Sequence, residues 1–255
     1  GNTSDFDPDN KVEYKDMEEI DKWALSRLNK LVKDCTENYE NFNFHLVYHD
    51  INQFCVTDMS NFYLDIIKDR LYTSKKNAIE RRSAQTAMYI ILDALVKMVA
   101  PMICFTAEEI WKYMPHTKNE QVESVMLSDW PEVVAEYDNK ELEEKWNHIL
   151  ELKELVAKEL EVARAQKVIG HSLNAKVTLF ANEDEYKFLE ENKELLTTIF
   201  IVSALEIKEN ERKDENKIGV KVEVAEGERC WKYSTEVGEN PDHPTLCHRC
   251  AEAIS

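Results

Sequence analysis

The feature that most constrains the fold of this chain is the spacing of its apolar residues between positions 42 and 82. These residues recur with the period of a helix, so that they share one face. They are Phe44, Val47, Tyr48, Ile51, Phe54, Cys55, Phe62, Ile66 and Ile67. We expect a helical stretch from Phe44 to Tyr72, either continuous or broken near Thr57. Its apolar face needs a core to pack against.

The same stretch runs into the densest group of cations in the chain. The group consists of Lys68, Arg70, Lys75, Lys76, Arg81 and Arg82. With Asp69 and Glu80 as the acids between positions 68 and 85, six cations give this segment a net charge of +4, whereas the whole chain carries −18. That overall charge argues against non-specific nucleic-acid binding, which requires neutralisation of phosphates. Two interpretations stay open: a local RNA-docking surface, and the solvated charged end of a core helix.

Three other segments show helical spacing. Their expected ranges are 16–39, 78–100 and 136–166. Two capping boxes predict helix starts, one formed by Asp16 with Glu19 and one by Thr106 with Glu109. Helices joined by short connections form an antiparallel bundle.

Beyond residue 167 the pattern changes to the alternation typical of strands. The expected elements are a strand at 175–180, a helix at 183–196, and strands at 199–207 and 220–224. This order predicts a small α/β unit after the helices.

Three cysteines cluster in the polar, loop-rich end of the sequence. Cys247 and Cys250 form a C-x2-C pair, and Cys230 lies 17 positions before it. Such spacing suggests a metal site rather than a disulfide, and zinc takes four donors at tetrahedral corners. Three alternatives stay open for the tail. The fourth ligand is His243 or His248, with His243 favoured because it lies outside the turn of the pair; or water takes that position; or no metal binds.

Catalytic motifs are missing from the sequence. It contains neither a G-x4-GK[ST] phosphate loop nor a readable Ser/His/Asp arrangement. The histidines at 45, 49, 148 and 171 lie apart along the chain, and we expect structural roles for them. No apolar run approaches the roughly 20 residues needed to span a bilayer, and the polar start shows no signal peptide. We therefore expect a cytoplasmic protein.

Several segments, in collinear order, carry a resemblance to a known family. They are WALSRLNKLV at 23–32, NFYLDIIKDRLY at 61–72, LDALVKMVAPMICFTAEEIWKYMP at 92–115, KVIGHSLNAKV at 167–177 and the cysteine-rich tail. The chain resembles the C-terminal part of bacterial-type isoleucyl-tRNA synthetases over nearly its whole length. The HIGH and KMSKS motifs of such enzymes are absent, so the resemblance implies a fragment without the catalytic site.

The resemblance implies a mainly α fold: the antiparallel helical bundle of a class Ia synthetase anticodon-binding domain, a small α/β junction unit and a zinc-ribbon-like tail. The expected parts are a linker from a missing catalytic core at 1–15, the anticodon-binding bundle at 16–135, a long connecting helix at 136–167, the junction domain at 168–225 and the tail at 226–255.

The resemblance also implies function. The parent enzyme, a class I synthetase, ligates isoleucine to tRNA(Ile) with ATP and Mg²⁺, and this fragment recognises the anticodon stem-loop. Its expected partners are that tRNA and the catalytic and editing domains of the same chain, in a monomer with no membrane association. The alternative is a helical protein-interaction module that does not bind RNA.

In the tail the sequence departs from the family pattern. The family's first pair is C-x2-C-W; Cys230 and Trp231 match its second Cys and its Trp, but Gly227 stands where the first Cys is expected. An aromatic side chain beside cations is typical of sites that read unpaired RNA bases. Besides the six cations above, we therefore predict RNA contacts for Trp231 and Arg249, and a Zn²⁺ site formed by Cys230, Cys247, Cys250 and His243. Trp231 could equally pack over the metal site.

Overall fold

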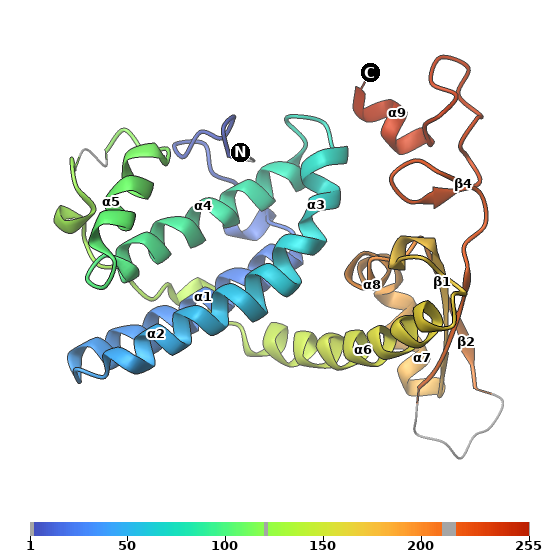
Figure 1. The fold of residues 1–255 in the computed structure, drawn as a ribbon, viewed down its shortest axis with the longest axis horizontal. Coiled ribbons are helices and arrows are strands. Elements are labelled where there is room, and N and C mark those ends of the chain that lie inside the picture. Colours follow the sequence, from blue (N-terminus) through green and yellow to red (C-terminus); the bar gives the residue numbers. More distant parts are fainter. Residues whose placement is uncertain (1–2, 120–121, 211–217, 255) are drawn as a thin grey trace. The chain divides into compact units, whose positions relative to one another are not determined.

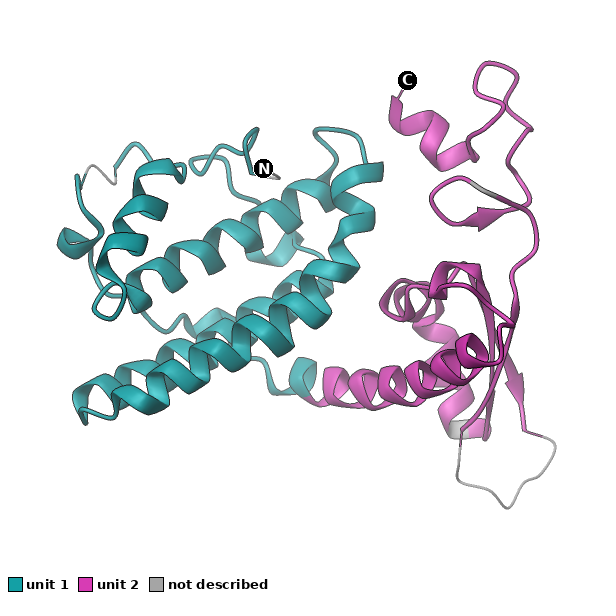
Figure 2. Ribbon diagram, in the orientation of Figure 1, with its two compact units in different colours: residues 1–143 teal, residues 144–255 magenta. Residues whose placement is uncertain are grey.

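The computed structural model describes residues 3–119, 122–210 and 218–254. The chain divides into two compact units, residues 1–143 and residues 144–255 (Figure 2). The boundary falls inside one helix, α6 (Lys140–Ala165). Each unit is considered by itself below.

The first unit is helical along most of its length (Figure 1). Its main helices are α1 (Glu19–Glu40), α2 (Phe44–Gln53), α3 (Leu64–Thr73), α4 (Ile79–Val99) and α5 (Cys104–Tyr113). Helix α1 packs against α2 and α4, and α4 also packs against α3 and α5. The mainly helical character expected from the sequence is confirmed.

The stretch from Phe44 to Thr73 is helical without interruption. Of the two predicted alternatives, a continuous helix and a helix broken near Thr57, the first is confirmed. Between α2 and α3, however, it continues as a π-helix, Phe54–Tyr63. Such segments are rare and are frequently found at functional sites. This one buries Phe54, Met59, Phe62 and Tyr63. The π-helix thus carries large side chains into the core while the chain stays helical.

Both expected capping boxes are wrong. Helix α1 begins at Glu19, so Glu18 takes the cap position that we assigned to Asp16, and no side chain caps the helix there. The backbone N–H of Glu18 instead donates to Ser83 Oγ on α4 at 2.9 Å. Helix α5 likewise begins at Cys104, two residues before the expected cap Thr106. For α1, a tertiary hydrogen bond occupies a backbone donor that a local cap would otherwise satisfy.

The segment before α1 packs against the helices. Phe6 is buried, and its ring centroid lies 5.5 Å from that of Tyr89 on α4. The same apolar cluster includes Val96, Trp111 and Met114. This contact fixes the segment around Phe6 on the helical unit.

The second unit contains a small three-stranded sheet in the order β2-β1-β3. The central strand β1 (Ala175–Ala181) pairs in parallel with β2 (Ala204–Glu209) and antiparallel with β3 (Gly219–Val224). In the register, Val177 lies opposite Leu205 on one side and Val222 on the other. The connection from β1 to β2 is helical, as a parallel pair requires.

That connection consists of two helices where we predicted one. Helices α7 (Glu183–Glu191) and α8 (Lys193–Phe200) meet at Asn192. The strand expected from residue 199 is wrong at its start, because Ile199 and Phe200 are buried residues of α8. Their β-favouring side chains are needed for helix packing instead, and β2 begins only at Ala204.

The end of the second unit holds two short strands, β4 (Glu228–Arg229) and β5 (Tyr233–Ser234), and the short helix α9 (His248–Ile254). The zinc-ribbon-like form of this tail stays a prediction. In the ranges that the structure describes, no helix has both the length and the apolar character needed to cross a bilayer.

Candidate nucleic-acid interface and metal centre

The turn between α3 and α4 carries the most accessible cations of the predicted cluster. Lys75 and Lys76 are exposed in this turn, and Lys68 is exposed on α3. Lys68 lies 2.7 Å from Asp65, a surface ion pair that stabilises little. Lys75 and Lys76 form no ion pair with any residue in the described ranges. These lysines therefore present positive charge to solvent.

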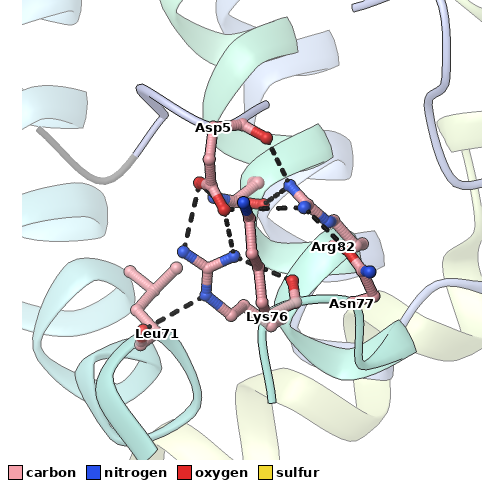
Figure 3. Close-up of polar contacts among 7 residues, drawn as sticks. Asp5, Leu71, Lys76, Asn77 and Arg82 are labelled. Atoms are coloured by element: carbon pink, nitrogen blue, oxygen red, sulfur yellow. Dashed lines mark hydrogen bonds and ion pairs between the residues drawn. The ribbon is translucent and has the colours of Figure 1, made fainter. Parts of the chain in front are cut away.

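Arg81 and Arg82, in the first turn of α4, both form ion pairs with Asp5, and Figure 3 labels Arg82 and Asp5. Arg81 Nη1 and Nη2 donate to the Asp5 carboxylate at 2.9 and 3.1 Å. Arg82 Nη1 donates to the Asp5 carbonyl oxygen at 2.8 Å. The hydrogen bond and charge of Arg81 hold the pKa of Asp5 well below its usual range, and Arg82 adds to the effect. Asp5 is therefore ionised and joins the start of the chain to α4.

The same arginines also hold the turn itself. Arg81 donates to the backbone carbonyl of Lys76 at 3.0 Å, and Arg82 donates to Asn77 Oδ1 at 3.0 Å (Figure 3). On the α3 side of the turn, Arg81 Nε lies 3.4 Å from the carbonyl oxygen of Leu71. Asp5 and the two arginines thus fix the backbone that carries the exposed lysines.

A third arginine forms a buried ion pair. Arg70 donates two hydrogen bonds to Asp21 on α1, at 2.7 and 3.0 Å, and Asp21 is fully buried. Tyr63 donates to the same carboxylate at 2.8 Å. The Ser83 hydroxyl donates to it as well. Burial alone would lower the pKa of Arg70, but the charge and hydrogen bonds of Asp21 raise it. Burial, together with the charge of Asp21, also raises the pKa of Tyr63 well above its ordinary value.

The predicted cluster therefore divides into two sets. Lys68, Lys75 and Lys76 face solvent, whereas Arg70, Arg81 and Arg82 have partners inside the first unit. Phosphate contacts stay a prediction for all six residues. The geometry favours the lysines for this role, because the arginines already serve to hold α1, α3, α4 and the turn together.

The acidic partners of these arginines were missed in the sequence. Asp21 follows Ile20 and precedes Trp23 on the buried face of α1. A charged residue on such a face is a signal for a buried partner of opposite charge. Asp5 carries no such signal, because its partners lie more than 70 residues further along the chain.

The three tail cysteines come together, as predicted. Their Sγ atoms all lie within 4.8 Å of one another, and Cys247 and Cys250 are buried. Zinc–sulfur bonds of about 2.3 Å at tetrahedral angles place two sulfurs roughly 3.8 Å apart. The three thiols therefore fit a zinc ion after a small adjustment.

The surroundings of the thiols differ. Burial would raise the pKa of Cys230, but hydrogen bonds from the backbone of Cys247 and from the neighbouring thiols outweigh it and lower the pKa. Burial raises the pKa of Cys250 to about 12. The thiolate is the form that ligates metal, and the surroundings of Cys230 favour it while those of Cys250 disfavour it.

The two candidate histidines lie outside the cysteine cluster. Of the His, Cys, Asp and Glu donors in the described ranges, none joins the three thiols. His248 is hydrogen-bonded to Glu239 at 2.8 Å, and this bond raises the pKa of His248. His243, which we predicted as fourth ligand, uses its backbone N–H to bond Asn240. Its metal role stays a prediction.

The two predicted RNA contacts in the tail differ in exposure. Trp231 is half-buried next to Cys230, and Arg249 is exposed on α9. The backbone of Trp231 also hydrogen-bonds Cys230 and lowers its pKa. Trp231 therefore belongs to the immediate surroundings of the thiols, while the RNA role of both residues stays a prediction.

Comparison with known proteins identifies two family matches. Residues 21–179 match the family described as the anticodon-binding domain of tRNA ligase. Residues 228–253 match the family described as the zinc finger found in FPG and IleRS. The first match covers most of the helical unit and continues to β1, and the second covers all three clustered cysteines.

Individual relatives agree with these matches. The chain is 50% identical over 259 residues to an isoleucine–tRNA ligase of Caldicellulosiruptor saccharolyticus. It is 45% identical over 266 residues to that of Caldanaerobacter subterraneus subsp. tengcongensis, and 44% over 260 residues to that of Kosmotoga olearia. Each alignment covers 100% of this chain and 28% of the relative. The chain therefore spans little more than a quarter of the length of these relatives.

Proposed function

Since the chain belongs to the family of anticodon-binding domains of tRNA ligases, we propose that it binds the anticodon stem-loop of tRNA(Ile) as part of an isoleucine–tRNA ligase. The tRNA is assigned from the relatives, which are isoleucine–tRNA ligases. The chain contributes binding energy that positions the tRNA rather than bond-making groups. The ligase reaction with ATP and Mg²⁺ is assigned to other parts of such a protein.

The observation that carries this proposal is the coincidence of the family match with an exposed cationic turn. The match at 21–179 includes Lys68, Lys75 and Lys76, all exposed, on a chain of net charge −18. A local positive surface on an acidic molecule attracts a polyanion to one place and repels it elsewhere. We place the RNA backbone at this turn, with Trp231 and Arg249 as further contacts.

The proposal extends to the tail. We assign Zn²⁺ to Cys230, Cys247 and Cys250, supported by the zinc-finger match and by the convergence of the three thiols. Bound there, zinc supplies structural cross-linking and no reaction step. The three cysteines hold the ion, and the half-buried Trp231 packs beside it.

The proposal also covers the partners, the oligomeric state and the cellular compartment of the chain. The partners are the tRNA and the catalytic and editing domains of one protein, which acts as a monomer in the cytoplasm. None of the six cysteines is joined in a disulfide in the described ranges, as is typical of a reducing compartment. We keep the parts at 1–15, 16–135, 136–167, 168–225 and 226–255 as the proposed domain boundaries.

The test is a gel-shift titration of this 255-residue chain with transcripts of tRNA(Ile) and tRNA(Val). We expect retention of tRNA(Ile) that weakens as salt increases, and weaker retention of tRNA(Val). Absence of any shift at low salt would overturn the proposal in favour of a protein-interaction module, which the family match disfavours. Equal retention of both transcripts would overturn the assignment of isoleucine.

A further inference from the structure

We infer that a metal ion bound by Cys230, Cys247 and Cys250 takes its fourth ligand from solution, so that the tail is a binding site for a small exchangeable donor such as a thiolate, an imidazole or water. The inference rests on the proposed zinc site. It selects one of the alternatives that the sequence left open.

Gly227 stands where a fourth cysteine is expected from the family pattern. Its backbone φ is +94°, a conformation that L side chains rarely adopt. A Cβ atom at this position would lie 2.4 Å from the backbone carbon and oxygen of Ser234. Ser234 is held in the ladder between β4 and β5, opposite Glu228. The local backbone therefore leaves no space for a ligand side chain at 227.

The nearby histidines do not join the group of thiols either. His248 lies next to Cys247 in sequence, but its Nε2 atom is 2.8 Å from Glu239 Oε2. His243 precedes the Cys pair and lies outside the cluster of thiols. Since the carboxylates of the described residues also lie outside that cluster, the described part of the chain supplies three donors to the ion.

The chemistry follows from the number of donors. Zinc sites with four protein ligands are closed, whereas sites with three protein ligands keep a fourth position for water or another small molecule. An exchangeable ligand also gives a chelator a route to the ion. A small thiol bound in the fourth position should therefore slow removal of the ion by the chelator.

The experiment replaces zinc by Co²⁺ in the 255-residue chain and follows the visible absorption bands of the ion. We expect imidazole and 2-mercaptoethanol, added separately, each to shift these bands in a saturable manner. His243→Ala and His248→Ala should leave the starting spectrum and both shifts unchanged. Cys104→Ser, which removes an exposed thiol of the first unit, is the matched control and should also change nothing.

Two outcomes overturn the inference. If the spectrum resists both added donors and changes in His243→Ala or His248→Ala, that histidine is the fourth ligand. If Co²⁺ and Zn²⁺ both fail to bind, the proposed metal site fails together with the inference. Binding of tRNA, measured separately by gel shift, distinguishes that failure from a failure of the RNA proposal.

Discussion

The helical unit and the cysteine tail differ in what holds each of them together. The helical unit buries large side chains such as Trp23, Tyr63 and Ile67, and it also contains the buried ion pair of Arg70 with Asp21. In the described residues from 226 to 254, the buried side chains are those of Cys247, Cys250 and Ala251. Burial of apolar area stabilises by about 25 cal/mol per Å², so the helical unit has a large source of stability that the tail lacks. We therefore expect the tail to depend on metal ligation for its stability.

The largest effect should follow removal of the metal or of one thiol. Chelation, or Cys250→Ser, should unfold the tail, because in small metal domains the free energy of binding, roughly 10–16 kcal/mol, is also the free energy of folding. The helical unit should keep its circular dichroism. Limited proteolysis with mass spectrometry checks this, with new cleavage expected only between about 226 and 254.

The control for that experiment is Cys104→Ser, which should leave the cleavage pattern unchanged. If the tail of Cys250→Ser remains as protected as that of the unmodified chain, the apolar contacts of the tail are sufficient, and the contrast between the two regions is wrong.

The next effect concerns the buried ion pair of the helical unit. Asp21→Ala should lower the free energy of unfolding by about 3–5 kcal/mol, because it leaves the Arg70 guanidinium without its buried partner. Tyr63 and Ser83 lose their acceptor as well. Urea unfolding followed by circular dichroism measures the change.

Asp65→Ala is the matched control for Asp21→Ala. It removes the partner of Lys68 in an ion pair whose side chains are about half exposed, and such pairs contribute about 0–1 kcal/mol. Equal destabilisation by the two substitutions would show that burial does not decide the strength of these pairs.

The division between helical unit and tail shows what a sequence pattern can predict. The helix from Phe44 onward follows from apolar spacing, since a buried face leaves a periodic trace in the sequence. The convergence of Cys230 with Cys247 and Cys250 follows from ligand spacing. The family resemblance, which the comparisons confirm, was carried by contiguous sequence segments.

Features that depend on distant partners were not predicted. The inward direction of Arg81 depends on Asp5, 76 positions away, and a charge run does not reveal which of its members are paired. The start of α1 depends on Ser83 rather than on its own first turn. Ile199 has a β-favouring side chain, yet tertiary packing places it in α8. In each case a tertiary contact outweighed the local preference.

A smaller effect should reveal the contribution of Asp5. The folded pKa of Asp5 is lower than its unfolded value because Arg81 and Arg82 stabilise the carboxylate. Its contribution is therefore complete above the unfolded pKa of about 4 and is lost as the pH falls toward the folded value. Since the side chain is partly exposed, we expect Asp5→Asn to cost about 1 kcal/mol at pH 7.

The difference in unfolding free energy between Asp5→Asn and the unmodified chain is the quantity to follow. It should shrink as the pH is lowered from 5 toward 2, because the unmodified chain then loses the same charge. Asp7→Asn, an exposed carboxylate two residues away, controls for the general effect of acid. A difference that stays constant with pH would remove the ion pair as its cause.

The smallest effect on stability should come from the residues proposed to matter most for RNA. Lys75→Ala combined with Lys76→Ala should change the free energy of unfolding by less than about 0.5 kcal/mol, as is usual for surface sites. Filter binding should nevertheless show weaker tRNA retention. If two phosphate contacts are lost, the slope of log affinity against log salt should become shallower by about 1.5.

Lys30→Ala with Lys33→Ala removes the same charge from another exposed part of the helical unit, on α1. An equal loss of affinity in that control would show that total charge, and not the turn, governs binding. Arg81→Ala with Arg82→Ala is less informative, because it should weaken binding and stability together by releasing Asp5 and the backbone of Lys76. The lysine pair separates the two functions, since its side chains face solvent while the arginines hold the turn that presents them.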